Sequence, residues 1–189
     1  DEIIRLIPDD DETTKLSNHQ TIKTSTDKTR IALPVFTPEG EFNKLRIKVK
    51  RLIRQGYTKW EVSDLATLRM LRTLGISDIT ADWTLYALNT AALAQLAELG
   101  IRRIVASPEN SRENLDELAT SPFAVEFLES QNTPLFISLN KPGEPPPPYI
   151  VHKRGNLWIT THRDPRTFHV PPNTSTRLDL SYDFQEPVA

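Results

Sequence analysis

Hydrophobic and polar residues alternate in a repeated pattern through the middle of the chain, over residues 60–109. Short apolar runs of strand type end at polar residues, and a segment with apolar residues at helical spacing follows each of them. The runs lie at 59–62, 79–81 and 103–106. Strands that alternate with helices are typical of a parallel sheet with helical crossovers, so the pattern predicts an α/β fold.

The same pattern extends towards the N-terminus. The apolar run 31–36 predicts a buried strand, and the turn signal at 37–40 ends it. Apolar residues then recur at helical spacing and predict an amphipathic helix over 43–55, with Gly56 after its end. The outer face of this helix is basic. We interpret it as a solvated surface and, alternatively, as a contact surface for RNA or another phosphate-bearing partner. The residues of the alternative are Lys44, Lys48, Lys50 and Arg51.

Polar residues at the strand ends are well placed to cap the helices that follow. Asp64 or Ser63 fits as the N-cap of a helix over 65–74. Asn89 fits as the N-cap of the next helix, which ends at Gly100. Each polar strand end therefore has a structural interpretation beside any chemical one.

The third helix and the segment after it are less sharply defined. Asn110 and Glu113 have capping-box-like spacing for a helix through Ala119. The segment 123–139 has features of both helix and strand. Its apolar, β-prone run 134–139 favours two strands.

The last part of the chain has a different character. Prolines concentrate after residue 140, with an unbroken run at 145–148, and proline favours turns and extended segments over helix. The runs 149–153 and 157–162 flank an Arg-Gly-Asn hairpin signal, which predicts a small antiparallel β appendage. Further short strands are expected at 168–170 and 178–180.

Composition narrows the functional classes. The formal net charge is −2, so the whole molecule is not an electrostatic match for nucleic acid or an anionic membrane. The chain has no cysteine, which excludes disulfides, thiol nucleophiles and thiolate-held zinc or iron–sulfur clusters within it. No apolar run approaches the roughly 20 residues that span a bilayer, and no signal-peptide pattern opens the chain. We therefore expect a cytoplasmic location without membrane contact, although the first residue is Asp1 and a targeting segment could have been lost.

The first thirty residues differ from the rest of the chain. An acidic run and then a tract rich in Thr, Ser and Lys show no sustained apolar period, which predicts a linker or the end of a preceding domain over 1–30. The apolar residues Ile3, Ile4, Leu6 and Ile7 are the exception, and they fit the end of a strand or a docking patch.

Several motifs together point to a family. They are WEVSDLATLRML at 60–71, DWTLYALN at 82–89, RRIVASPE at 102–109, PLFISL at 134–139 and HKRGNLWI at 152–159. In order and spacing they resemble the collagenase-like peptidases, peptidase family U-thirty-two. Members of that family have a glutamate-bearing strand, an Asp-Trp turn and a Ser-x-Glu after the next strand. The resemblance extends over about residues 31–180.

The resemblance implies part of a TIM-like (β/α) barrel with a C-terminal β appendage. A complete barrel takes about 250 residues, so this chain would be the C-terminal half of a barrel whose first half lies upstream. The expected organisation is a linker at 1–30, a half-barrel body at 31–142, and a proline-rich spacer with the appendage at 143–189. Family members are linked to collagenase-like proteolysis, or to RNA-base or quinone hydroxylation with a cysteine-held iron–sulfur cluster. This chain has Leu-Asn-Lys-Pro at 139–142, where the family commonly has a cysteine, so it cannot hold such a cluster alone.

Four polar residues are the candidate catalytic groups. Glu61, Asp82, Ser107 and Glu109 lie at or just after the C-terminal ends of predicted strands, the usual active-site side of a barrel. Paired carboxylates there could perform general acid/base chemistry or hold a divalent metal, for which nothing else in the sequence argues. The structural interpretation is that they cap helices and satisfy loop amides.

The candidate ligand-binding residues are Trp83 and Asn89. Trp83 would either pack over the barrel end or stack on a ligand, and Asn89 either caps a helix or contacts that ligand. A metal site built from His152, His162 and His169 is conceivable, but no acidic cluster accompanies them and we expect none.

Three hypotheses remain. The leading one is the C-terminal barrel half of a collagenase-like peptidase-family protein, with catalysis incomplete or absent without its upstream half. The second is a binding module for RNA or a protein partner that uses the basic helix and the appendage. The third is a structural domain that completes a larger barrel or a homo-oligomer, because a half-barrel leaves strand edges unpaired.

Overall fold

The computed structural model describes the backbone of residues 3–6 and all of 26–154 and 156–179. The chain divides into two compact units, Asp1–Glu126 and Phe127–Ala189. This division falls inside a strand, whereas the sequence predicted a boundary at 142/143.

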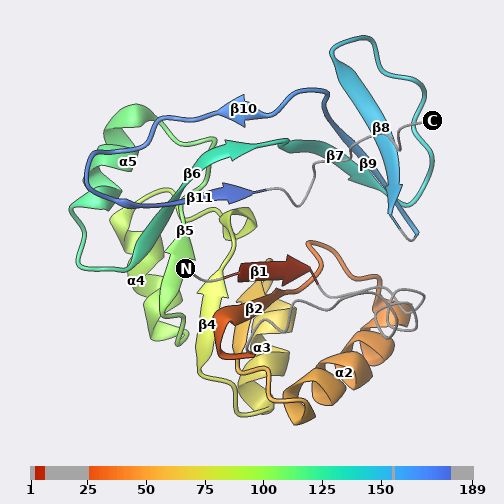
Figure 1. The fold of residues 1–189 in the computed structure, drawn as a ribbon, viewed down its shortest axis with the longest axis vertical. Coiled ribbons are helices and arrows are strands. Elements are labelled where there is room, and N and C mark those ends of the chain that lie inside the picture. The colour runs from red at the N-terminus through yellow and green to blue at the C-terminus, as the bar shows by residue number, and fades with distance from the viewer. Residues whose placement is uncertain (1–2, 7–25, 155, 180–189) are drawn as a thin grey trace. The chain divides into compact units, whose positions relative to one another are not determined.

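The first unit is a parallel sheet with helical crossovers (Figure 1). The order of its strands in space follows their order in the chain. Its strands are β1 Ile3–Leu6, β2 Thr29–Ala32, β3 Lys59–Val62, β4 Asp78–Ala81, β5 Arg103–Val105 and the start of β6 Val125–Gln131. Its helices are the short 3-10 turns η1 Thr26–Lys28 and η2 Trp83–Leu85, and α2 Glu39–Arg54, α3 Leu65–Thr73, α4 Thr90–Glu98 and α5 Arg112–Ala119.

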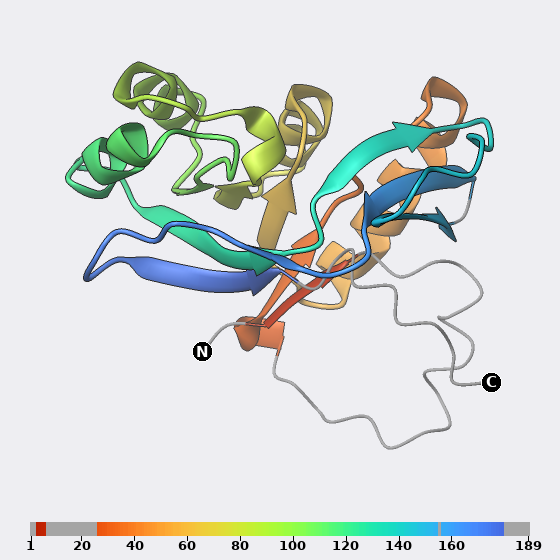
Figure 2. The same cartoon turned by 90° about the horizontal axis from the view of Figure 1, so that it is seen from above.

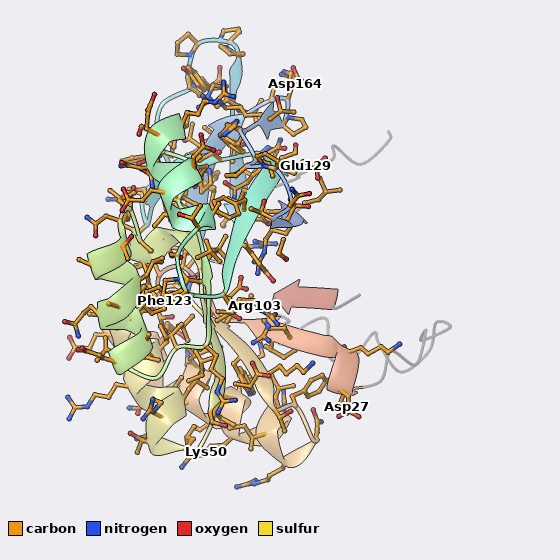
Figure 3. All side chains as sticks on the ribbon, turned by 90° about the vertical axis from the view of Figure 1, so that its left-hand side faces the viewer. Asp27, Lys50, Arg103, Phe123, Glu129 and Asp164 are labelled. Carbon is orange, nitrogen blue, oxygen red and sulfur yellow. The ribbon has the colours of Figure 1, made fainter. Side chains whose placement is uncertain are left out.

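The helices of this unit all lie on one side of its sheet. Right-handed crossovers between strands that are neighbours in both sequence and space place every helix on the same face. Figure 2 shows the sheet curling, with α3, α4 and α5 in a row along one side, and Figure 3 shows the same layering from another direction. The predicted α/β class is thus confirmed as a parallel sheet curled into a half-barrel. A complete TIM barrel is not formed by the described residues.

Register divides the sheet into two chemically different faces. Partner residues of parallel strands point to the same face, and successive residues point to opposite faces. One face carries the buried row Ile31, Trp60 and Ile79, and it packs on the apolar stripes of the helices. A parallel sheet covered on both sides is usually apolar throughout. In this sheet the residues that alternate with that row are largely polar. The face without helices is therefore not a second apolar packing surface.

Local signals set most helix ends. Asp64 and Asn89 are the N-caps of α3 and α4, as the sequence predicted, through hydrogen bonds from the Thr67 and Ala92 backbone N–H groups. For α5 the prediction was wrong, because Ser111 is the N-cap and Asn110 instead accepts a hydrogen bond from the Ser111 N–H.

The N-terminal side of α2 differs from the prediction. The strand expected over 31–36 ends at Ala32, and the helix expected over 43–55 begins at Glu39. The reason is that Pro38 is the extended N-cap, and acidic residues follow it in the first turn, where they suit the helix dipole. The turn signal at 37–40 is therefore a helix start. The apolar segment Ile3–Leu6, which was expected to be the end of a strand or a docking patch, forms the strand β1 and pairs in parallel with β2.

The second unit is made of β-strands. The later residues of β6 pair with β10 Arg166–Thr167 and β11 Ser175–Asp179. A separate antiparallel sheet has the order β7-β9-β8, with β7 Pro134–Ser138, β8 Tyr149–Arg154 and β9 Leu157–His162. The predicted strands in 123–139 and the predicted β appendage are confirmed.

Two short strands of this unit were misplaced. The strand expected at 168–170 is β10 at Arg166–Thr167, because Ser130 and Gln131 of β6 pair with those residues. The strand expected at 178–180 begins at Ser175, and residue 180 lies outside the described residues. None of the described helices is long and apolar enough to cross a membrane.

Candidate functional site

The face of the half-barrel without helices carries an ordered row of polar side chains. Glu61, Thr80 and Arg103 are register partners on β3, β4 and β5. Glu61 is 4% exposed and Thr80 is fully buried. The Thr80 hydroxyl has no hydrogen-bond partner in the described part of the structure. An acid, a hydroxyl and a base thus stand side by side across three strands.

Ion pairs flank this row on the same face. Arg30, 1% exposed, donates to Asp78 Oδ1 at 2.9 Å and to the Trp60 carbonyl oxygen at 3.0 Å. At the other side, Arg103 Nε lies 3.4 Å from Glu126 Oε1. Charges of both signs alternate along the face, so it is suited to a polar partner and not to a second apolar layer.

Asp82 and Ser63 form a first cluster beyond the C-terminal ends of β3 and β4. The Ser63 hydroxyl donates to Asp82 Oδ2 at 3.2 Å, and the Trp83 backbone N–H donates to Asp82 Oδ1 at 2.8 Å. The Thr84 hydroxyl donates to the Ser63 carbonyl oxygen at 3.1 Å. Asp82 therefore starts η2 and also joins two neighbouring loops. The role of Ser63 in this cluster depends on strand register and was missed from sequence.

Glu109, Ser107 and Tyr86 form a second cluster at the next strand end. The buried Ser107 hydroxyl accepts a hydrogen bond from the Glu109 backbone N–H at 3.3 Å. The Tyr86 hydroxyl donates to Glu109 Oε2 at 3.1 Å. Tyr86 has φ 52 and ψ 49, a left-handed conformation that is unusual for a bulky residue. No sequence signal marked Tyr86, although it lies inside the motif at 82–89.

The environment of Tyr86 changes its ionisation. Burial raises the pKa of the phenol above its usual value of 10.0, and the hydrogen bond to Glu109 and the negative charge of that carboxylate raise it further. The phenol is therefore held neutral as a hydrogen-bond donor, which orients the Glu109 carboxylate.

The structure shows what the side chains of the two predicted ligand-binding residues do. Trp83 is buried in the core, and the Asn89 side chain caps α4, so each has the structural role. Asn110 donates from Nδ2 to the Leu88 carbonyl oxygen at 3.0 Å, which joins the loops before α4 and α5. Within the described residues, no group of three His, Cys, Asp or Glu side chains lies close enough to hold a metal ion.

The basic helix predicted as the alternative site keeps its charged surface. Lys44, Lys50 and Arg51 are exposed on α2, and Lys48 is half-buried. Lys44 is paired with Glu41 at 3.1 Å. The opposite side of α2 is buried through Leu45, Val49 and Leu52.

Comparison of the chain with protein-family models, with curated proteins and with solved structures finds no match in any of the three. The class of protein is therefore defined by the fold and the site alone. It is an α/β half-barrel whose helix-free face and strand ends carry acidic, basic and hydroxyl groups.

Proposed function

We propose that this chain is one half of a (β/α) barrel and forms one wall of a site for a polar substrate. The other barrel half of its parent protein would complete the site. The observation that carries the proposal is the row of register partners Glu61, Thr80 and Arg103, of which Glu61 and Thr80 are buried, on the face where a barrel has its interior. The Thr80 hydroxyl is buried without a hydrogen-bond partner in the described part of the structure, which supports a polar ligand at this face, since desolvation of an unpartnered hydroxyl is unfavourable.

The chemistry that this wall favours is hydrolysis of a peptide or a similar polar bond. Asp82 lies two residues beyond Thr80, the register partner of Glu61, so the backbone positions of the two acids differ by about 7 Å along the strand direction. One carboxylate at such a distance could position a water molecule while the other transfers a proton. The resemblance to the collagenase-like peptidases supports the same class, and we propose that catalysis is incomplete without the other half.

The test combines the chain with the other barrel half and measures gelatin hydrolysis. Glu61→Gln and Asp82→Asn should abolish the activity while leaving the circular dichroism spectrum and the unfolding midpoint close to those of the parent chain. Glu113→Gln, on the exposed surface of α5, is the matched control and should be fully active. If the first two variants only destabilise the chain, or if the mixture is inactive while correctly assembled, the proposal is wrong.

A second candidate function is RNA binding through α2. The observation in its favour is that the acidic residues of this helix are confined to its first turn, at Glu39 and Glu41, while all its later charged residues are basic. RNA affinity should fall steeply with salt, and Lys50→Glu with Arg51→Glu should lower both the affinity and the salt slope. Arg69→Glu with Arg112→Glu, at exposed positions of α3 and α5, gives the same change in net charge and is the control. Affinity that is equal in both variants would exclude α2 as the binding surface.

A further inference from the structure

The antiparallel sheet of the second unit has two edges of opposite character. β8 forms one edge and carries His152, Lys153 and Arg154 at its end. Such charges are a usual protection of an edge strand against pairing with another chain. β7 forms the other edge, and the chain has no charged residue between Glu129 and Lys141. The β8 edge is therefore protected by charge, whereas the β7 edge has no charge and is interrupted only near its start, at Pro134 and the register shift that follows it.

The β7 edge also exposes large apolar side chains. Leu135 is 47% exposed and Phe136 is 54% exposed, and Leu139 just after the strand is 53% exposed. The pairing of β7 with β9 shifts register between Pro134 and Phe136, so regular alternation of side chains across the sheet begins at Phe136. Within the described residues, β7 pairs only with β9. Its outer N–H and C=O groups are thus available to a further strand with apolar side chains.

We propose that β7 pairs with β7 of a second copy of this chain, antiparallel and about a two-fold axis at Phe136. This inference is independent of the proposed catalytic role. The sequence of β7, PLFIS, is self-complementary about that axis. In this pairing Leu135 lies opposite Ile137 of the second copy, and the two Phe136 residues lie opposite each other. Apolar and aromatic cross-strand pairs of this kind are stabilising, and no like charges oppose each other.

The two-fold symmetry of the contact determines the size of the assembly. A two-fold interface uses the same patch on both subunits and therefore closes at a dimer. Joining two three-stranded sheets along β7 gives one continuous six-stranded sheet with a charged β8 edge at each end. Because the interface is a single short strand, it is smaller than the roughly 1,200 Å² typical of stable complexes, and the dimer is reversible.

Sedimentation equilibrium of the whole chain tests the proposal. The mass should rise from monomer to dimer, and no further, as the concentration increases to about 1 mM. Phe136→Lys places two like charges at the axis and should keep the chain monomeric at every concentration. Leu178→Lys is the matched control, since it changes an equally exposed apolar residue of the same unit on β11 and should dimerise like the parent.

A cross-link tests the register directly, because the chain has no cysteine of its own. Residues that face each other in antiparallel strands have Cα atoms about 4.5–5.5 Å apart, within the range of a disulfide. Phe136→Cys should therefore form a covalent dimer on mild oxidation, and Leu178→Cys should not. A parent chain that stays monomeric, a Phe136→Lys variant that still dimerises, or mass growth beyond the dimer would each overturn the proposal.

Discussion

Gly100 combines two local constraints at the end of α4. Its φ of +86 is a left-handed conformation, and a Cβ there would clash with the guanidinium group of Arg72, which donates to the Leu99 carbonyl oxygen at 2.8 Å. Gly100→Ala should therefore lose about 1–2 kcal/mol to backbone strain and about 1 kcal/mol more from the displaced hydrogen bond. Urea unfolding measures this loss.

Gly75 provides the matched control for Gly100. Its φ is +81, and nothing lies within 4 Å of an added Cβ. Gly75→Ala should therefore show the strain alone and lose less stability than Gly100→Ala. In an Arg72→Met background the two substitutions should have equal effects. If they already have equal effects in the parent chain, the contact with Arg72 is unimportant.

The raised pKa of Tyr86 predicts how the stability of the fold depends on pH. Because its pKa is raised in the folded state, the neutral phenol is favoured by folding. Its contribution to stability is thus fully present below the unfolded pKa of 10.0, and it is lost as the pH rises through the folded pKa. The phenol absorbance titration of the parent chain minus that of Tyr86→Phe should show a transition above pH 10.0, and Glu109→Gln should shift it downwards. A difference titration centred at or below the usual value would contradict the contact with Glu109.

At the scale of one element, the start of α3 depends on the side chain of its N-cap residue. The sequence left Asp64 and Ser63 as alternative caps, and in the structure Asp64 Oδ1 accepts from the Thr67 backbone N–H at 2.8 Å. Asp64→Ala should cost about 1 kcal/mol in the free energy of unfolding, because an N–H at the helix start loses its acceptor. Asp64→Asn keeps an acceptor and should stay close to the parent chain. An Asp64→Asn variant as unstable as Asp64→Ala would point to charge rather than to capping.

Elements set by local chemistry were predictable from the sequence, and elements set by distant pairing were not. The strand at 59–62 and the N-cap Asn89 follow from apolar pattern and side-chain type, and both agree with the structure. The short strand β10 gains its conformation from its partner β6, so no local signal marks its residues, whereas the apolar residues of β1 left a strand and a docking patch as alternatives. The start of α2 was missed because proline followed by acidic residues is both a turn signal and a helix-start signal.

The residues of the candidate site were likewise predictable where a local pattern marks them and not where they depend on distant contacts. Glu61 and Asp82 were found because polar residues at the ends of parallel strands share one end of the sheet. Their partners were not found, because the Ser63 contact with Asp82 depends on register across two strands. Tyr86 was missed because its left-handed backbone belongs to the loop and not to the residue type.

At the scale of the whole molecule, strand β6 links the two units. Its first residues extend the parallel sheet beside β5, and its later residues pair with β10 in the second unit. The chain therefore presents two kinds of strand edge, one on the parallel sheet at β1 and one on the antiparallel sheet at β7. The half-barrel proposal concerns the first, and the proposed dimer concerns the second, so the two can be tested separately.

Light scattering of the Phe136→Lys variant tests the half-barrel proposal independently of the proposed dimer. Without pairing through β7, the variant alone should be monomeric. Mixing with the other barrel half should give a one-to-one complex, because within the described residues β1 pairs only with β2 and its other edge can pair with a further parallel strand. Adding Glu61→Gln should leave this complex intact, since the change affects the wall of the site and not the strand edge. A homodimer that persists in the Phe136→Lys variant would mean that the parallel sheets pair with each other. A monomer that never captures the other half would mean that the sheet is complete as it stands, and the polar face would then need a different explanation from a barrel interior.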